Sequence, residues 1–212
     1  MDQTFNARSD FDEYRTQTEC VLAAHFRLAP DPAAAAAQLA GMVKESGVQL
    51  KTGFVGTPYL LHVLSDCGYH DLAWSLLLRT EYPSWLYPVT KGATTIWEHW
   101  DGIMQNGGFW SADMNSFNHY AYGSVADWVY GVAAGIQPAQ PGYERISIAP
   151  HPDERLGWLS AELRTRRGVI RSAWKRTENV WRYEMTVPVE AEITIGGVTR
   201  TVRPGSYIFY QE

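Results

Sequence analysis

The sequence predicts a two-part α+β protein in which a helical half is followed by a small antiparallel β-sandwich. Apolar residues recur with the 3.6-residue period of helices in the first half and with the two-residue period of strands in the second. Between the halves, residues 137–142 contain two prolines and a glycine, which interrupt helices and central strands. We therefore predict domains at 1–137 and 138–212.

The composition excludes several classes of partner. The chain has 212 residues, of which 45% are hydrophobic and 19% charged, and this is typical of a globular protein. A net charge of −5 gives no basic surface for nucleic acid or anionic lipid, and no apolar stretch approaches the roughly 18 residues of a membrane span. We expect neither nucleic acid nor a membrane as a partner. Residues 1–4 lack the features of a signal peptide, so localisation stays open, and is cytoplasmic if Met1 is the genuine start.

The first predicted helix spans about 11–28. Val21 and Phe26 belong to its apolar stripe, which follows helical spacing. Asp10 is a suitable N-cap, and Glu13 lies three positions later, where a capping box places its acidic partner. These features predict that the helix begins close to residue 11.

The second predicted helix spans about 32–46. Asp31 is its expected N-cap, Pro32 suits the first helical position, and Gly47 is a stop signal. The run of alanines at 33–37 favours a helix, because alanine has the highest helix propensity. We interpret this run as part of a surface helix and not as a linker.

The remaining predicted helices span about 57–67, 71–79 and 119–134. Thr57 is the expected cap of the first of these, with Pro58 after it, and Gly135 is expected to end the last. Cys20 and Cys67 lie within helical patterns, so we expect buried structural thiols and no disulfide. Short helices joined by short turns are typical of helical hairpins.

The second half predicts six or seven short strands, around residues 146–148, 159–163, 169–174, 181–185, 193–195, 198–199 and 206–210. Gly196-Gly197 is a two-residue hairpin signal between two of these strands. Further turns are expected at 177–179 and at Pro204-Gly205. Short strands at regular intervals indicate a small sandwich.

The segment 81–118 has weak periodicity and an unusual composition. It contains four tryptophans, namely Trp85, Trp97, Trp100 and Trp110. A long, loop-rich stretch inside a compact domain is usually functional. An indole can stack on the C–H face of a sugar, and the nearby carboxylates Glu98 and Asp101 can bind hydroxyls. A packed aromatic core is the alternative interpretation.

Glu98 is the candidate catalytic residue. Because Trp97 and Trp100 flank it, its pKa is expected to rise, which would suit a general base. On composition alone, an exposed or ion-paired glutamate is the simpler interpretation. Asp101 is more suited to orienting a partner than to catalysis.

Metal and cofactor chemistry is not expected. His99 and His119, together with Glu98 and Asp101, match no zinc spacing such as H-E-x-x-H. There is no glycine-rich phosphate loop, no G-x-S-x-G string and no Cys–His signature. We therefore predict neither a metal nor another cofactor.

Four strings carry a family resemblance. They are Thr52-Gly53-Phe54-Val55-Gly56-Thr57-Pro58, Tyr82-Pro83-Ser84-Trp85, Gly92-Ala93-Thr94-Thr95-Ile96-Trp97-Glu98 and Ser116-Phe117-Asn118-His119-Tyr120-Ala121-Tyr122-Gly123-Ser124-Val125. In content and order they resemble the bacterial α-L-rhamnosidases of glycoside hydrolase family 78. The resemblance extends from about Tyr14 to the end of the sequence.

The resemblance implies an inverting hydrolase that removes terminal non-reducing α-L-rhamnose from a glycoside or polysaccharide. It also implies an (α/α)6 barrel followed by a β-sandwich. By resemblance, Glu98 is the general base and His119 contacts the sugar. As further substrate neighbours we add Trp85, Trp97, Trp100 and Asp101.

The sequence departs from the family in two ways. An (α/α)6 barrel needs twelve helices, whereas about five precede the predicted sandwich, so we expect a partial toroid of five to six helices. The acidic motif that carries the family's general acid is not found before Gly92. We expect the C-terminal part of a rhamnosidase, inactive alone, with an open half-barrel that favours self-association. The alternatives are a carbohydrate-binding fragment that uses the tryptophans and His119, and a purely structural role.

Overall fold

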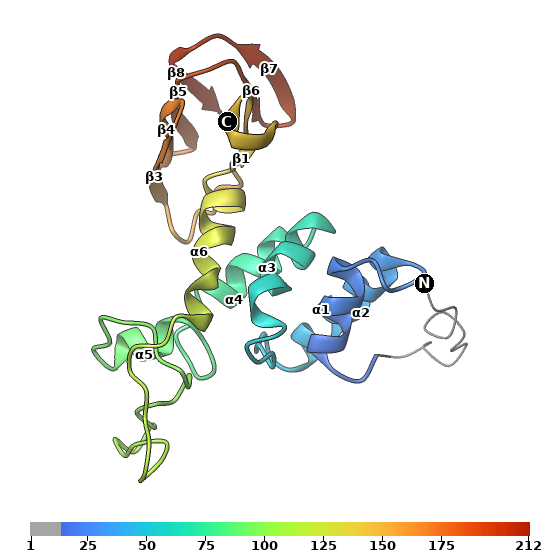
Figure 1. Ribbon diagram of the computed structural model, residues 1–212, viewed down its shortest axis with the longest axis vertical. Coiled ribbons are helices and arrows are strands. Elements are labelled where there is room, and N and C mark those ends of the chain that lie inside the picture. The colour runs from blue at the N-terminus through green and yellow to red at the C-terminus, as the bar shows by residue number, and fades with distance from the viewer. Residues whose placement is uncertain (1–13) are drawn as a thin grey trace. The chain divides into compact units, whose positions relative to one another are not determined.

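The computed structural model describes residues 14–212, and the chain divides into two compact units, Met1–Ser124 and Val125–Glu212 (Figure 1). Within the described residues, six α-helices are followed by two four-stranded sheets. The predicted fold class, a partial helical toroid followed by a β-sandwich, is confirmed. No helix in residues 14–212 is long and apolar enough to cross a bilayer.

The first unit is built on short helices. They are α1 (Gln17–His25), α2 (Pro32–Glu45), α3 (Thr57–Asp66), α4 (His70–Leu77), α5 (Leu86–Thr90) and the 3₁₀ helix η2 (Ala121–Ser124). Helix α1 packs against α2 and α3, and α3 also packs against α4 and η2. Buried aliphatic and aromatic side chains join these helices, among them Val21, Leu39, Leu60, Leu64, Trp74 and Leu76.

Helix α1 begins later than predicted. Thr16 is its N-cap, and the hydroxyl of Thr16 accepts a hydrogen bond from the Glu19 N–H at 3.2 Å. The Glu19 carboxylate in turn accepts from the Thr16 N–H at 3.0 Å, so the pair forms a complete capping box. The predicted start near residue 11 is therefore wrong. The predicted cap, Asp10, and its partner, Glu13, lie outside the described residues.

Helix α2 matches its predicted cap but not its predicted exposure. The Asp31 carboxylate accepts hydrogen bonds from the N–H groups of Ala33 and Ala34, at 2.9 and 3.1 Å. However, Ala35 and Ala36 are buried against neighbouring helices. The alanine run is therefore only partly a surface feature, and its small side chains allow close packing.

Helix α3 corrects two details at its ends. Its N-cap is Gly56, and Thr57 is the first helical residue, with its hydroxyl hydrogen-bonded to the Thr52 carbonyl at 3.2 Å. Cys67, at the C-terminal end of α3, is exposed, so the prediction of a buried thiol there is wrong. Cys20 is buried as predicted, and burial raises the pKa of its thiol to about 11. Both cysteines are free.

The segment 81–118 is mostly irregular, as predicted, although the short helix α5 within it was not expected. The last helical stretch begins at Ala121, two residues after the predicted start at His119. It continues from η2 into α6 (Val125–Trp128) and the π-helical turn η3 (Val129–Ala133), which belong to the second unit.

The second unit contains two four-stranded sheets. Their strands are β1 (Ile136–Pro138), β2 (Ile146–Ile148), β3 (Trp158–Thr165), β4 (Gly168–Thr177), β5 (Val180–Val187), β6 (Ala191–Ile195), β7 (Val198–Val202) and β8 (Gly205–Gln211). The strand orders are β1-β2-β6-β7 and β3-β4-β5-β8. Alternate residues of both sheets are buried in the sandwich core, among them Ile148, Ile170, Trp174, Tyr183 and Ile193.

The sheets differ from the prediction in two respects. Strands β2 and β6 pair in parallel, so the sandwich is not wholly antiparallel. Strand β1 includes Gln137 and Pro138, which belong to the segment expected to interrupt regular structure. It ends at Pro138 and is an edge strand, a position that tolerates proline because one side of the strand needs no hydrogen-bond donors.

The predicted glycine hairpin is confirmed. Gly196 and Gly197 have φ angles of 55° and 77°, and the flanking residues Ile195 and Val198 are paired. A two-residue turn with two positive φ angles matches the right-handed twist of its strands. This turn fixes the register between β6 and β7.

The end of the last helical stretch is bonded to the sandwich. The Trp174 indole N–H donates to the Ala133 carbonyl at 2.8 Å, and the Ser172 hydroxyl donates to the Ala134 carbonyl at 2.6 Å. Gly135 then reverses the chain with a φ of 74°. Helix α6 and turn η3 therefore pack as part of the second unit. The assignment of residues 1–137 to half of an (α/α)6 barrel and of residues 138–212 to a β-sandwich domain stays a prediction.

Candidate active site

Two of the family strings lie side by side in the first unit. The Glu98 N–H donates to the Ser116 carbonyl at 3.0 Å, and the His119 N–H donates to the Ile96 carbonyl at 2.8 Å. These bonds join the segments that carry Glu98 and His119 in antiparallel fashion. Residues 21 positions apart in the sequence are thus placed on neighbouring pieces of backbone.

Two aromatic rings stack on His119. Its imidazole stacks on Phe54, with ring centroids 5.0 Å apart and planes inclined by 10°. Tyr120 stacks at 5.4 Å. The His119 Nδ1 atom accepts a hydrogen bond from the Ala121 N–H at 3.3 Å. A neutral ring with Nδ1 as acceptor carries its proton on Nε2, which is then able to donate to a hydroxyl.

Tyr122 connects the aromatic residues behind this segment. Its ring stacks on Trp100 at 3.7 Å with an angle of 15° and contacts Phe54 at 5.0 Å. The Trp85 indole N–H donates to the Tyr122 carbonyl at 2.9 Å, and Trp85 packs edge-on against Trp100. The string that contains His119 is therefore hydrogen-bonded to the string that contains Trp85 and in ring contact with the string that contains Phe54.

The predicted tryptophans differ in exposure. Trp85 and Trp97 are buried, at 7% and 5% of their surface, and Trp97 packs edge-on against Phe117. Their surfaces are covered by protein, so they can position neighbouring groups but offer little area to a ligand. Trp110 is 46% exposed and stacks on His99 at 3.6 Å.

The Glu98 side chain is half-buried, and no side chain within residues 14–212 forms an ion pair with it. The charge of Glu98 acts on Tyr122. Burial is the largest cause of the raised pKa of Tyr122, and interactions with Tyr82 and Glu98 raise it further. A carboxylate that is partly desolvated and not ion-paired is available to accept a proton from a bound water.

Asp101 acts on a different pair of phenols. Burial raises the pKa of Tyr82, and the negative charge of Asp101 raises it further. The same two causes raise the pKa of Tyr87, whose hydroxyl donates to the Ile103 carbonyl at 3.0 Å. The negative charge of Asp101 therefore acts on both of these phenols. No group of three or more potential metal ligands occurs in residues 14–212.

Phe54, Tyr82, Tyr87 and Tyr122 were not among the predicted site residues. Phe54, Tyr82 and Tyr122 lie within the quoted strings, so their positions were available as a signal. Their partners follow from tertiary contacts, which no local pattern reveals.

Both halves of the chain match known family models. Residues 3–133 match the family model of the bacterial alpha-L-rhamnosidase 6 hairpin glycosidase domain. The chain belongs to the bacterial alpha-L-rhamnosidase family. Residues 135–202 match the bacterial alpha-L-rhamnosidase C-terminal domain. The family predicted from the four strings is therefore confirmed.

Curated relatives agree with this assignment. The chain is 42% identical to an alpha-L-rhamnosidase of Streptomyces avermitilis over 175 residues, which is 82% of the chain and 17% of the relative. It is 43% identical to an alpha-L-rhamnosidase of Formosa agariphila over 188 residues, or 87% of the chain and 20% of the relative. The chain thus spans a fifth or less of the length of these relatives.

Solved structures of the family share the fold. The crystal structure of Streptomyces avermitilis alpha-L-rhamnosidase complexed with L-rhamnose matches with a TM-score of 0.87 and 36% identity, over 93% of this chain and 22% of that one. Native alpha-L-rhamnosidase from Aspergillus terreus also has a TM-score of 0.87, at 35% identity, over 92% of this chain and 24% of that one.

Proposed function

We propose that this chain supplies the general base and part of the sugar-binding site for inverting hydrolysis of terminal α-L-rhamnosides. In this proposal, Glu98 is the base and His119 binds a hydroxyl of the rhamnose. Trp97, Trp100, Asp101 and Trp85 surround the site and hold its geometry. The substrate is a rhamnose-containing glycoside or polysaccharide.

The observation that carries the proposal is the backbone pairing of the two strings. Glu98 N–H to Ser116 carbonyl and His119 N–H to Ile96 carbonyl bring the proposed base and the proposed sugar contact to adjacent segments. The base also has no ion-pair partner within residues 14–212. Both features suit a carboxylate that activates water beside a bound sugar.

The chemistry requires a second carboxyl group. In an inverting hydrolase, the base takes a proton from the attacking water while an acid, roughly 6.5–9.5 Å from the base, protonates the leaving oxygen. We propose that this chain lacks that acid. Because general acid catalysis contributes about 10²–10⁴-fold, hydrolysis of ordinary rhamnosides by this chain alone is expected to be negligible.

A substrate that needs no acid tests the base directly. Fluoride leaves without protonation, so α-L-rhamnosyl fluoride requires only the attacking water and its base. We expect this chain to hydrolyse the fluoride faster than the uncatalysed rate and to leave phenyl α-L-rhamnoside intact. Glu98→Gln should remove the fluoride activity, because an amide cannot accept the proton.

Glu45→Gln is the matched control, since Glu45 is an exposed glutamate at the end of α2. It should leave the rate unchanged. Equal fluoride rates in the original chain and in Glu98→Gln would contradict the role of Glu98. L-rhamnose binding without any fluoride hydrolysis would favour the alternative of a non-catalytic carbohydrate-binding fragment.

A further inference from the structure

We propose that the outer face of strands β3, β4 and β5 binds an acidic sugar residue of a glycan, with Trp158 as the stacking surface and Lys175 as the partner of the sugar carboxylate. This site lies in the second unit. It is separate in the sequence from Glu98 and His119. The choice of a glycan as ligand rests on the function proposed above.

Strand register places the proposed groups in one row. Trp158 is paired with Lys175, and Lys175 is paired with Arg182. Directly paired residues of antiparallel strands have Cβ atoms about 4.5–5.5 Å apart and point to the same face of the sheet. Trp158 and Lys175 therefore project from neighbouring strands on the same face of the sheet.

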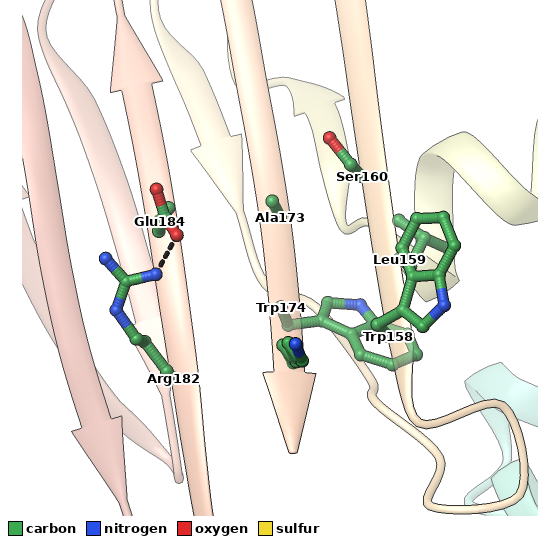
Figure 2. Close-up of a pocket in the computed structure, with 8 residues that line it drawn as sticks. Trp158, Leu159, Ser160, Ala173, Trp174, Arg182 and Glu184 are labelled. Atoms are coloured by element: carbon green, nitrogen blue, oxygen red, sulfur yellow. Dashed lines mark hydrogen bonds and ion pairs between the residues drawn. The ribbon is translucent and has the colours of Figure 1, made fainter. Parts of the chain in front are cut away.

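A hollow lies along this row. It has a volume of about 450 Å³, and its lining includes Trp158, Ser160, Ala173 and Glu184 (Figure 2). Ser160 and Ala173 are paired across β3 and β4, so small side chains lie next to the indole. Trp158 is 62% exposed on the edge strand β3. An exposed indole beside small residues leaves room for the C–H face of a pyranose ring.

The charges on this face favour an anionic ligand. Arg182 is ion-paired with Glu184, as the dashed line in Figure 2 shows. By contrast, Lys175 is exposed and has no ion-pair partner within residues 14–212. The lining of the hollow thus carries one cation in excess, on the residue paired with Trp158. A uronic acid stacked on Trp158 would place its carboxylate within reach of that ammonium group.

The other groups suit sugar hydroxyls. The Ser160 hydroxyl can donate and accept, the Glu184 carboxylate accepts, and the Arg182 guanidinium donates. A flat apolar partner would bury the Ser160 hydroxyl and the Lys175 ammonium group without supplying hydrogen-bond partners, which costs free energy. The combination of one stacking ring with several exposed polar groups therefore favours a single sugar residue.

Isothermal titration calorimetry of the whole chain tests the site, with trigalacturonic acid as the acidic probe and galactotriose as the neutral one. We expect trigalacturonic acid to bind more tightly. Trp158→Ala should weaken binding of the acid by about tenfold or more, because it removes the stacking surface. Lys175→Ala should weaken it by about three- to fivefold and leave any binding of galactotriose unchanged.

Two controls are available on the same unit. Tyr210→Ala removes an exposed aromatic on the opposite edge strand, and Arg203→Ala removes an exposed cation. Both should retain binding. Circular dichroism would show that each variant is folded, which is expected because all four side chains are exposed.

The outcomes separate this proposal from the proposed catalytic function. Binding of trigalacturonic acid that survives Glu98→Gln but is lost in Trp158→Ala supports a distinct second site. No binding by the original chain would overturn the proposal, whatever the fluoride assay shows. Equal affinity in Trp158→Ala and the original chain, or in the acidic and neutral probes, would also overturn it.

Discussion

Tyr122 illustrates how single side chains support the proposed catalytic residues from behind. Its ring lies against Trp100 and Phe54, and its carbonyl accepts the hydrogen bond of Trp85. Phe54 in turn stacks on His119. Phe54 contacts the imidazole directly and Tyr122 contacts Phe54, so we propose that both are positioning residues.

Tyr183 gives a prediction on pH dependence. Its side chain is buried in the sandwich, its hydroxyl donates to the Gln211 side chain at 2.8 Å, and burial raises its pKa to about 12. An unfolded tyrosine titrates near pH 10, so the folded state holds this proton more tightly. The stabilisation is therefore complete below pH 10 and is lost as the pH rises from 10 towards 12, by about 2 to 3 kcal/mol.

Urea unfolding of the second unit between pH 8 and pH 12 checks this prediction. Tyr183→Phe removes the ionisable group, so its stability should fall less steeply above pH 10 than that of the original chain. Parallel loss of stability in both proteins would mean that other groups cause the alkaline unfolding.

The candidate site residues could be predicted from the sequence to different degrees. Glu98 and His119 lie in strings with a family resemblance, and the structure brings those strings together. Phe54 lies 65 positions before His119 in the sequence. Their ring contact accompanies the packing of α3 against η2, which no local pattern predicts. The burial of Trp85 and Trp97 could not be predicted from the sequence either, because a sugar-binding surface and a packed core are both rich in tryptophan.

At the scale of elements, the turn after η3 has a strict requirement. Gly135 has a φ of 74°, and a Cβ atom there would lie 2.2 Å from the carbonyl carbon of Ala149. This close approach accompanies the hydrogen bond from the Ala149 N–H to the Gly135 carbonyl at 3.0 Å. The glycine is therefore needed both for its conformation and for its lack of a side chain.

Gly135→Ala is expected to destabilise the second unit by about 3 kcal/mol or more, because backbone atoms must move to relieve the clash. Gly197→Ala is the matched control. Gly197 has a similar φ of 77° but nothing within 4 Å of its added Cβ, so a cost of about 1 kcal/mol is expected.

Thermal unfolding of the two variants measures the difference. Equal losses of stability would show that the φ angle alone matters at Gly135 and that the backbone adjusts without cost.

The sequence predicted most elements, and its errors have local causes. The prediction placed the capping box of the first helix at Asp10 and Glu13, whereas α1 uses Thr16 and Glu19, which have the same spacing. Strand β1 was not predicted because proline is unfavourable in a central strand. An edge strand tolerates Pro138, because one of its sides has no neighbouring strand. The parallel pairing of β2 with β6 joins strands that are far apart in the sequence. The hydrophobic period predicts a strand but not its partner or its direction.

At the scale of the whole molecule, the chain spans about a fifth of its relatives, so a partial toroid is expected to leave apolar side chains uncovered. In the first unit, Phe26 and Leu28 are more than half exposed. We propose that this chain self-associates through such surfaces.

Sedimentation velocity at several concentrations tests self-association. We expect the sedimentation coefficient to rise with concentration, and the double variant Phe26→Ser, Leu28→Ser to raise the dissociation constant about tenfold or more. Val198→Ser, on the hairpin of the second unit, should change little. A monomer at all concentrations would contradict the proposal.

The central claim is that Glu98 and His119 lie in one rhamnose site, and the most direct test is a nuclear magnetic resonance titration with L-rhamnose. We predict chemical-shift changes at the His119 ring and at the backbone N–H groups of Glu98 and His119, with much weaker changes for the enantiomer D-rhamnose. His119→Ala should weaken binding and leave the Trp158 indole signal unchanged. L-rhamnose that shifts neither residue, or that acts no differently from D-rhamnose, would contradict the claim.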